Sequence, residues 1–435
     1  MAIANLATAP KTVNSDKKYG GALSLVTSLF FMWGFLTCLN DILVPHLKAI
    51  FDLNYTQASL VQFAFFTGYF IFSLPSGKVV EWVGYQGTMV MGLCTMGIGA
   101  LLFIPAASLA SYPLFLAALL VLAGGMTLLQ VSANPYVAIL GPAKTASSRL
   151  NLTQAFNSLG TFVAPYVGGA LILTASTLTM EQMRKLPAAE LQAYRLQQAA
   201  SVKTPYVVFA AVLFLCAIAF AMFKLPKIES AEKHEGEQAR WSEVFASRNL
   251  VLGAFGIFFY VGGEVSIGSY LINYMNMPEI GNISEKLAAT YLMLYWGGAM
   301  VGRFVGSALL QRIPTRLLLG AFAAIAASLV TISMISTGHI AMFTILAVGL
   351  FNSIMFPSIF TLGVDGLGKL TAKGSSVLIA AIVGGALIPN IQGRLADAMG
   401  LHHAFIVPAL CYVYILFFAF AAHELGKSPE LKSAK

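Results

Sequence analysis

The chain has 435 residues, of which 58% are hydrophobic and 10% are charged. Soluble globular domains carry about 25% charged residues, so this composition excludes a protein whose whole surface faces water. The net charge of +8 comes from bases spread over short hydrophilic segments rather than gathered in one patch, which argues against nucleic acid as a partner. The composition predicts a membrane protein whose main surroundings are the lipid bilayer.

Twelve apolar segments follow one another along the chain. A helix needs about 20 apolar residues to cross the hydrocarbon of a bilayer, and these segments reach that length without alternating, which argues against a β-barrel. We therefore predict an all-α membrane protein with twelve transmembrane helices. The segments lie near residues 22–48, 57–80, 87–106, 113–139, 150–174, 204–224, 248–275, 287–310, 317–335, 340–363, 375–396 and 402–423.

Hydrophilic segments divide these helices into two halves. The expected order is an N-terminal tail (1–21), a six-helix bundle (22–224), a solvated linker (225–247), a second six-helix bundle (248–424) and a C-terminal tail (425–435). Residues 176–203 are expected to add a short surface helix. Most Lys and Arg fall in the cytoplasmic segments if both termini lie inside, which predicts that orientation, with a bacterial inner membrane as the location.

The two halves repeat some of their helix-breaking and small residues. An offset of 224 residues relates Gly125 to Gly349, Gly160 to Gly384, Pro165 to Pro389 and Gly169 to Gly393. Parallel repeats of this kind occur in secondary transporters, which bind their substrate near the middle of the bilayer between the halves. The offset therefore favours two six-helix repeats and a transport function.

Two acidic residues lie inside predicted spans. Asp41 is in the first span and Glu264 is in the seventh. A charged side chain at mid-bilayer costs roughly 2.5–3.5 kcal/mol or more, so such a residue is usually functional. A buried carboxyl takes up and releases protons, which suits proton coupling. The alternative is a structural hydrogen bond or ion pair between helices.

Amide side chains form a second group of candidates, because an amide both donates and accepts hydrogen bonds and so suits an uncharged, hydroxylated ligand such as a sugar. The alternative is that they join helices to one another. Aromatic rings on which a sugar could stack are Trp33, Tyr260 and Trp296. The amides are Gln130, Asn134, Gln154, Asn157, Asn352, Asn390 and Gln392, with Asn40 beside Asp41 as a further candidate.

Motifs of other function classes are missing from the sequence. There is no GxxxxGK[ST] loop for nucleotide, and no HExxH or GxSxG motif of membrane hydrolases. The four cysteines lie within apolar segments and form no CxxC pair. We therefore expect no enzyme activity, no cofactor and no metal.

Several longer motifs resemble the fucose–galactose–glucose:proton symporter family of the major facilitator superfamily. They are the runs 31–35 (FMWGF), 39–45 (LNDILVP), 133–137 (ANPYV), 149–158 (RLNLTQAFNS) and 356–360 (FPSIF), and the likeness extends over all twelve spans. The resemblance implies the twelve-helix fold of that superfamily and sugar transport coupled to protons by alternating access.

The resemblance also assigns individual residues. Asp41 matches an acid of the first span that the fucose member uses for proton coupling, whereas Gln130 stands where that member has a second acid. Glu264 matches an acid of the glucose/galactose branch, so the chain is nearer that branch than fucose. Gln154 and Asn157 would contact the sugar.

The function expected from the sequence is hexose:proton symport, with a glucose/galactose-type sugar or N-acetylglucosamine as the small-molecule partner. The alternatives are a carrier of fucose or another small polar solute, and coupling to sodium instead of the proton. A channel or sensor on the same scaffold is a more remote alternative. The oligomeric state is left open, and a monomer is compatible with the sequence.

Overall fold

The computed structural model describes residues 19–51, 55–109, 111–172, 185–187, 189–191, 193–194, 203–226 and 240–426, and within these residues every regular element is a helix. The expected surface helix at 176–203 and the two expected tails lie largely outside the described residues, as does most of the expected linker. For residues 39–60 and 165–172, the structure describes at most the backbone.

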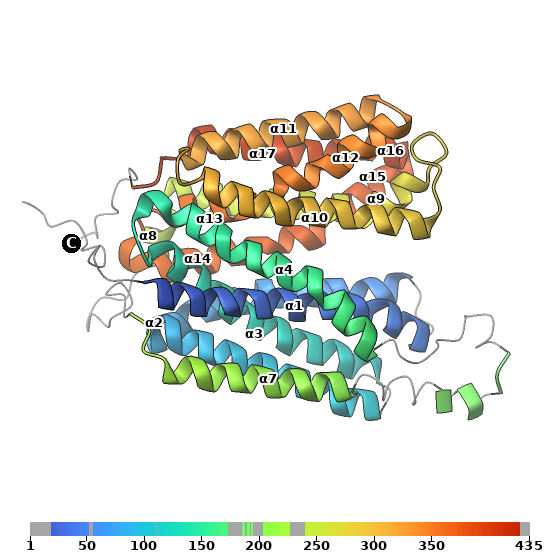
Figure 1. Cartoon of the computed structure of the whole chain (residues 1–435), viewed down its shortest axis with the longest axis horizontal. Helices are drawn as coiled ribbons and strands as arrows, with labels where there is room; N and C mark the ends of the chain where they lie inside the picture. The colour runs from blue at the N-terminus through green and yellow to red at the C-terminus, as the bar shows by residue number, and fades with distance from the viewer. Residues whose placement is uncertain are drawn as a thin grey trace, which may run out of the picture.

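The first half of the chain packs as one group of helices, coloured blue to green in Figure 1. Its α2 covers two of the predicted spans, so the half contains six spanning helices. The elements are α1 (Gly20–Phe51), α2 (Tyr55–Ser108), α3 (Tyr112–Ile139), the short η1 (Ala143–Thr145), α4 (Ala146–Ile172) and α7 (Lys203–Met222).

The chain reverses direction inside α2, at Gly84. The φ angle there is +74°, in the region that favours glycine because it has no Cβ. Gly68 in the first part of α2 packs against Ala123 of α3, and Gly92 in the second part packs against Gly125 of the same helix. The two parts therefore run side by side as separate spans. The expected hairpin between segments 57–80 and 87–106 is a sharp turn at one residue.

The second half forms the other group of helices, yellow to red in Figure 1. Three predicted spans are divided here, each into shorter helices that follow one another: α12 with α13, α14 with α15, and α16 with α17. The elements are α8 (Trp241–Phe245) within the expected linker, α9 (Arg248–Asn276), α10 (Glu285–Leu309), α11 (Thr315–Ile335), α12 (Gly338–Asn352), α13 (Met355–Val364), η3 (Gly368–Leu370), α14 (Thr371–Ala380), η4 (Ala381–Val383), α15 (Gly384–Met399), α16 (Leu401–Ala404) and α17 (Ile406–Ala421).

A glycine contact is repeated between the halves. Gly160 of α4 lies directly against the backbone of α1 at Phe31, and Gly384, at the start of α15, lies directly against the backbone of α9 at Phe258. Both contacts bring two helices closer than a side chain would allow. The fifth span therefore packs on the first in the same way as the eleventh packs on the seventh. This shared packing explains why a glycine stands at both positions, 224 residues apart.

Among the described residues, seven helical segments are long and apolar enough to cross a membrane. One of them, Phe63–Ser108, contains both spans of α2. Shorter apolar stretches at Gly20–Leu36 and Tyr206–Met222 belong to α1 and α7. With α4 and α10 added, the protein is an all-α membrane protein of twelve transmembrane helices arranged as two six-helix repeats, as the sequence predicted.

Both ends of the described chain lie at one end of the helix bundle, at the left in Figure 1. Near the start of α1, the ring of Tyr19 lies by Gly141, which follows α3. After α17, the backbone N–H of Gly426 donates to the carboxylate of Asp365, 3.0 Å away. We call this the terminal end of the bundle. Since successive spans reverse direction, the C-terminal parts of α3, α10 and α13 and the N-terminal parts of α4 and α14 also lie there.

The contact at Gly384 gives a stability prediction. Gly384→Ala places a methyl group on the backbone of Phe258, so we expect it to lower the free energy of unfolding by about 1–3 kcal/mol, the usual range for overpacking. Gly297→Ala is the matched control, because a Cβ there has no atom within 4 Å. Thermal unfolding of the purified protein in detergent is the measurement. Equal melting temperatures for the two variants would contradict the close packing of α9 and α15.

Candidate functional site

Hydroxyl groups join the two halves at the terminal end. The hydroxyls of Ser147 (α4) and Thr361 (α13) lie 2.5 Å apart, and Thr315 donates to the same Ser147 oxygen over 3.1 Å. Ser148 and Ser307 each donate to the backbone carbonyl of the other, at 2.7 and 3.0 Å. These bonds connect α4 of the first half with α10, α11 and α13 of the second, so the halves are in contact on this side.

An ion pair adds to the same interface. The Nζ atom of Lys373 on α14 lies 3.5 Å from a carboxylate oxygen of Glu81 on α2. The same Nζ lies 5.5 Å from the ring centre of Trp241 in α8, within the range of a cation–π contact. Lys373 therefore links the first half, the second half and the helix that precedes the second half.

Proline frees a backbone carbonyl at this interface. Proline has no N–H, so the carbonyl four residues before it loses its helical partner. Pro135 in α3 frees the carbonyl of Val131, and Ser375 of α14 donates its hydroxyl to that oxygen over 3.0 Å. The unsatisfied group of one half is thus bonded by a side chain of the other.

A second proline has the same effect in the second half. Pro357 frees the carbonyl of Ser353, at the break between α12 and α13, and the Nε atom of Arg303 donates to it over 3.3 Å. Pro357 by itself indicates a kink within the predicted span 340–363, and the break lies one turn earlier because the ring of proline disturbs the residue four positions before it.

Arg303, on α10, also reaches the first half. Its Nη1 atom donates to the backbone carbonyl of Gln154, 3.4 Å away, and to the hydroxyl of Ser158. The carbonyl of Arg303 accepts a hydrogen bond of 2.7 Å from the side chain of Asn151. Three consecutive turns of α4 therefore contact this single residue of α10.

Glu264 lies on α9 within a group of aromatic hydroxyls. The hydroxyl of Tyr260 donates to Oε1 of Glu264 over 2.8 Å, and the hydroxyl of Tyr295 donates to its backbone carbonyl over 3.4 Å. Asn352 donates in turn to the hydroxyl of Tyr295, 2.7 Å away, and the ring of Tyr412 lies near both. We call these residues the Glu264 cluster. The Glu264 side chain is partly accessible, whereas the four neighbours are fully buried.

A positive charge faces this cluster. Arg303 is close enough to interact electrostatically with Glu264 and with Tyr260. An opposite charge stabilises a carboxylate in a medium of low dielectric constant. The structure therefore brings together an acid, a base and hydroxyl groups inside the spans, and the acid remains reachable.

A smaller polar group lies in the first half. The amide of Gln130 on α3 donates to the hydroxyl of Tyr69 on α2 over 2.8 Å, and Trp33 of α1 also hydrogen-bonds Tyr69. The three residues connect three helices of one half. Part of the hydrogen-bonding capacity of Gln130 is thus used within the protein.

Gln154 and Asn157 lie three residues apart on α4. Gln154 is 6% exposed, and its side-chain amide has no hydrogen-bond partner among the described residues. The amide nitrogen of Asn157 donates to the carbonyl of Phe30 on α1 over 2.9 Å, and its Oδ1 atom has no partner within the described part of the chain. These two side chains therefore keep free hydrogen-bonding capacity.

The remaining amides differ in their surroundings. Asn134 and Gln392 are fully buried, and both polar atoms of each have no partner among the described residues. Asn390 is exposed, and its amide donates to the carbonyl of Ala386 in the preceding turn, 2.6 Å away. A buried amide without a partner is costly, so Asn134 and Gln392 are sites for ordered water or for a partner brought by a conformational change.

Three further candidates are placed as follows. Trp296 is 42% exposed, and its ring centre lies 5.1 Å from that of Tyr295. Asn40 and Asp41 lie on α1, and their side chains are outside the described part of the structure.

Sequence reasoning missed three members of the site: Arg303, Tyr295 and Tyr412. Arg303 has a signal in the sequence, because it is a base within the predicted span 287–310, and a charged residue inside a span is a functional candidate by default. The two tyrosines have no such signal, since tyrosine is common in membrane helices as a packing residue.

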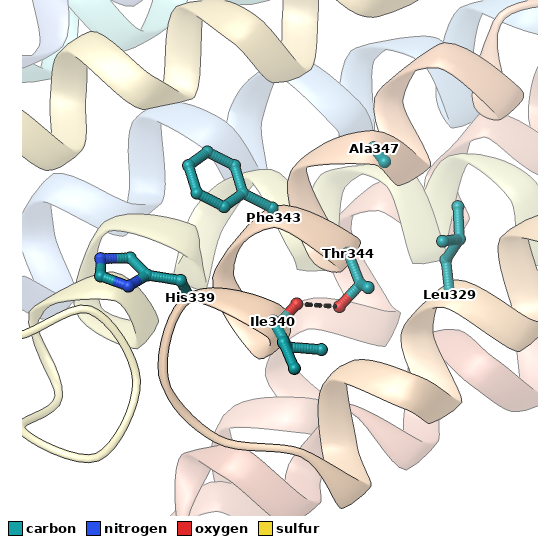
Figure 2. Close-up of a pocket in the computed structure, with 6 residues that line it drawn as sticks. All are labelled: Leu329, His339, Ile340, Phe343, Thr344 and Ala347. Atoms are coloured by element: carbon teal, nitrogen blue, oxygen red, sulfur yellow. Dashed lines mark hydrogen bonds between the residues drawn. The ribbon is translucent and has the colours of Figure 1, made fainter.

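Grooves on the outside of the second half offer little polar chemistry. The groove in Figure 2 lies over α11 and α12, and its one hydroxyl, that of Thr344, donates to the carbonyl of Ile340 in its own helix over 2.8 Å. A second groove lies between α4, α10 and α12 and is lined mostly by apolar side chains. Neither groove includes a member of the Glu264 cluster. In the described part of the chain, no three His, Cys, Asp or Glu side chains gather as a metal site would require.

Two matched six-helix halves, in contact at one end and with polar groups inside the spans, define a membrane transporter. Comparison with known proteins agrees with this class. The sequence model of the Major Facilitator Superfamily matches residues 25–389. A "Glucose/galactose transporter" of Brucella abortus biovar 1 (strain 9-941) is 52% identical over 405 residues, covering 93% of this chain and 95% of that protein.

One further relative is named as a fucose symporter, and one similar crystal structure is that of the transporter FucP. The "L-fucose-proton symporter" of Escherichia coli (strain K12) is 35% identical, with 94% of each chain covered. The crystal structure of the transporter FucP in the outward conformation superposes with a TM-score of 0.88 at 35% identity, covering 93% of this chain and 99% of that one. The chain belongs to the fucose–galactose–glucose:proton symporter family of the Major Facilitator Superfamily.

The bond from Ser375 to Val131 gives a prediction about closure of the terminal end. Ser375→Ala leaves the carbonyl freed by Pro135 without a partner, at a cost of about 1–3 kcal/mol to the closed arrangement. We expect the variant to open at the terminal end more often, measured as faster labelling of a cysteine introduced at the buried Ala146 of α4, with the four native cysteines replaced. Ser376→Ala is the control, because the Ser376 hydroxyl donates to Lys373 of its own helix and to no other residue in the described part of the chain. Equal labelling rates would show that the Ser375 bond does not hold the halves together.

Proposed function

We propose that this chain is a hexose:proton symporter of the glucose/galactose type, located in a bacterial inner membrane. The relative with 52% identity bears the name of a glucose/galactose transporter, and the relative with 35% identity bears the name of a proton symporter. Sugar specificity is taken from the first and proton coupling from the second. The sequence relation to the first is much nearer, so glucose and galactose are preferred over fucose.

Both termini are assigned to the cytoplasm, so the terminal end faces inward. The distribution of bases along the sequence supports this orientation. The hydroxyl bonds and the ion pair between Lys373 and Glu81 then close the cytoplasmic side. The structural relative in the outward conformation has the same overall arrangement, which fits a carrier ready to receive its substrates from outside.

The observation that carries the proposal is the partly accessible Glu264 among buried tyrosines. Tyr260 holds one carboxylate oxygen, and the other oxygen has no hydrogen-bond partner among the described residues, so it is free to take a proton or bond a sugar hydroxyl. A proton bound there from the outside and released to the cytoplasm would move with each sugar. Asp41 is the second proposed proton-binding residue, from its place in the first span.

Gln130 stands where the fucose member of the family has an acid. This difference changes which residues can bind the proton. An amide does not titrate at physiological pH, and Gln130 donates to Tyr69. Proton binding is therefore assigned to one acid in each half, Asp41 and Glu264, rather than to two acids in the first half.

Sugar binding is assigned to the amides that keep free capacity. Gln154 and Asn157 lie on α4, whose backbone is fixed to α10 by Arg303, so both halves meet near them. Tyr260 and Trp296 offer aromatic faces, and Asn352 adds a buried Oδ1 acceptor. The other proposed sugar ligands are Asn40, Gln130, Asn134, Asn390 and Gln392, of which Asn134 and Gln392 need a rearrangement to reach a ligand.

Transport in reconstituted vesicles tests the function. We expect glucose or galactose to accumulate against its gradient when an inward proton gradient is the energy source and sodium is absent. Asp41→Asn and Glu264→Gln should each reduce accumulation strongly while sugar exchange persists. One proton crossing 100 mV releases about 2.3 kcal/mol, whereas a tenfold sugar gradient costs about 1.4 kcal/mol, so losing the proton removes enough energy to be measured.

Controls and alternatives belong to the same experiment. Glu285→Gln, an exposed acid at the start of α10, should accumulate sugar as the unmodified protein does. Fucose, fructose and N-acetylglucosamine are tested beside glucose and galactose. Accumulation only of fucose, or only with a sodium gradient, would replace the proposal by one of its alternatives.

Gln154 gives a separate prediction about affinity. Gln154→Ala removes an amide that has no partner among the described residues, so we expect sugar binding to weaken by about 1–3 kcal/mol, the cost of an unpaired buried sugar hydroxyl. Calorimetric titration with the transported sugar is the measurement. Gln311→Ala, at an exposed position after α10, is the control. Unchanged affinity in the Gln154 variant would remove α4 from the sugar site.

A further inference from the structure

We propose that a phospholipid binds in the groove between α4, α10 and α12, with an acyl chain between the two halves and its phosphate beside Lys286. The chain keeps the halves apart at the end of the bundle opposite the terminal end, which we call the far end. The inference goes beyond the proposed function, because it concerns a lipid and depends only on the protein spanning a membrane, whichever solute it carries.

The groove lies where α4 and α10 move apart. Nearer the terminal end the two helices touch, and the rings of Phe156 on α4 and Phe304 on α10 lie edge to face with their centres 5.8 Å apart. Toward the far end the helices diverge in Figure 1, and the exposed Phe162 of α4 and Val301 of α10 line the groove. The groove is therefore a crevice between the halves that opens to the surroundings of the spans.

The walls of the groove are mostly apolar, and its floor is open. Its volume is about 750 Å³, and the hydroxyl of Thr290, which lines it, donates to the carbonyl of Lys286 in the preceding turn over 3.2 Å. A Cβ at Gly297 would have no atom within 4 Å, so this residue leaves space in the groove. A Cβ at Gly298 would lie 3.3 Å from the backbone nitrogen of Leu350, so α10 and α12 close the floor behind that space.

An acyl chain is the occupant that suits this space. Gly297 follows the first residue of α10 by twelve positions, or about 18 Å of helix, so it lies near the middle of a hydrocarbon layer about 30 Å thick. An ordered water needs two to four polar partners, which this lining does not supply. Lipid chains surround the spans at this depth. A chain in the groove gains packing contacts that an empty groove would forfeit.

Lys286 gives the groove a polar outer end. It is an exposed residue in the first turn of α10, and it precedes Thr290, Met293 and Gly297 on one helix face, at intervals of four, three and four residues. A lysine at a membrane surface attracts lipid phosphate. Gly297 lies about 16 Å deeper along the same face, so one lipid can reach both. The neighbouring acid, Glu285, lies about 100° around the helix and does not share this face.

A bound chain separates the halves because the two sides of the groove belong to different halves. Phe162 is part of the first half, and Met293 and Gly297 are part of the second. Closing the far end would bring α4 toward α10, which narrows the groove and expels the chain. The lipid therefore favours the arrangement that is closed at the terminal end. It shifts this equilibrium by as much as its affinities for the two arrangements differ.

Native mass spectrometry of the full-length protein, titrated with phosphatidylglycerol, tests the site. We expect one lipid to bind more tightly than the others. Gly297→Leu fills the groove and should weaken that binding about tenfold or more, which corresponds to the cost of overpacking. Ala321→Leu is the matched control, because it adds the same side chain at an exposed position of α11 outside the groove, and it should bind as the parent does.

Lys286→Gln tests the contact with the phosphate. It should weaken the same binding about fivefold, the effect of one lysine near a charged membrane surface. Diacylglycerol has the chains without the phosphate, so the parent should bind it as weakly as the variant binds phosphatidylglycerol. Lys203→Gln is the control, since Lys203 is a base at the far end of α7, away from the groove, and its removal should leave the affinity unchanged.

Distance measurements test the effect on the halves. Spin labels at Lys144 and Gln311, exposed residues of the two halves at the terminal end, are placed in a variant whose four native cysteines are replaced. We expect phosphatidylglycerol added to the protein in detergent to increase the population with short distances. Gly297→Leu should need about tenfold more lipid for the same increase, because its site binds the lipid more weakly.

Three results would overturn the inference. Equal lipid affinity of Gly297→Leu and the parent would show that the groove does not hold the chain. A dimer that Gly297→Leu breaks up, with no lipid retained, would assign the groove to a second copy of the protein. Distances that stay unchanged when the site is saturated would show that the lipid does not separate the halves. If Gly297→Leu does not fold, Lys286→Gln still decides, since unchanged affinity there contradicts the proposed site.

Discussion

Hydrocarbon offers no hydrogen-bond partner, so every polar group inside the spans must be satisfied by the protein or by water that the protein admits. This constraint explains much of the interface between the halves. Pro135 and Pro357 each free a backbone carbonyl, and the carbonyls of Val131 and Ser353 are bonded by Ser375 and Arg303. Breaks in the helices thus create the acceptors by which helices recognise one another. The bond from Ser375 to Val131 joins the two halves, so it is lost when they separate and must then be replaced by water, whereas the bond from Arg303 to Ser353 lies within the second half.

The same constraint makes the Glu264 cluster informative. Tyr260 and Tyr295 commit their hydroxyls to Glu264, and Asn352 supports Tyr295, so the acid is held in a defined orientation within the second half. Burial of a lone carboxylate would be costly, and Arg303 reduces that cost. In the first half, Gln130 and Tyr69 form a polar group without a charge. The described parts of the two repeats therefore share a fold but differ in the polar groups that they place inside the spans.

The sequence predicted the helices well because hydropathy is a property of each segment. The apolar runs gave the twelve spans, and the matched Gly160 and Gly384 gave the repeat, which the same backbone contact in each half explains. The turn at Gly84 was placed to within a few residues. The break at Ser353 was not placed exactly, since its position depends on which carbonyl Pro357 disturbs and on Arg303 being there to bond it.

The candidate site was predictable in part. Glu264 was found because an acid within an apolar run is unusual, and motifs shared with the sugar symporters drew attention to Gln154 and Asn157. The environment of each amide could not be read from the sequence, because it depends on how the helices are rotated. Gln392 is fully buried while Asn390, two residues away, is exposed. Arg303 was left unassigned for a similar reason: its contact with α4 joins residues almost 150 positions apart.

The central claim is that a sugar and a proton cross the membrane together. Sugar-evoked current across a supported membrane containing the purified protein tests it most directly, with sodium absent and no sugar gradient other than the one applied. The account predicts that glucose or galactose evokes a transient current carrying positive charge in the direction of sugar movement, because a neutral sugar carries none itself. Sugar transport with no accompanying current or proton flux, or a current that requires sodium, would contradict the account.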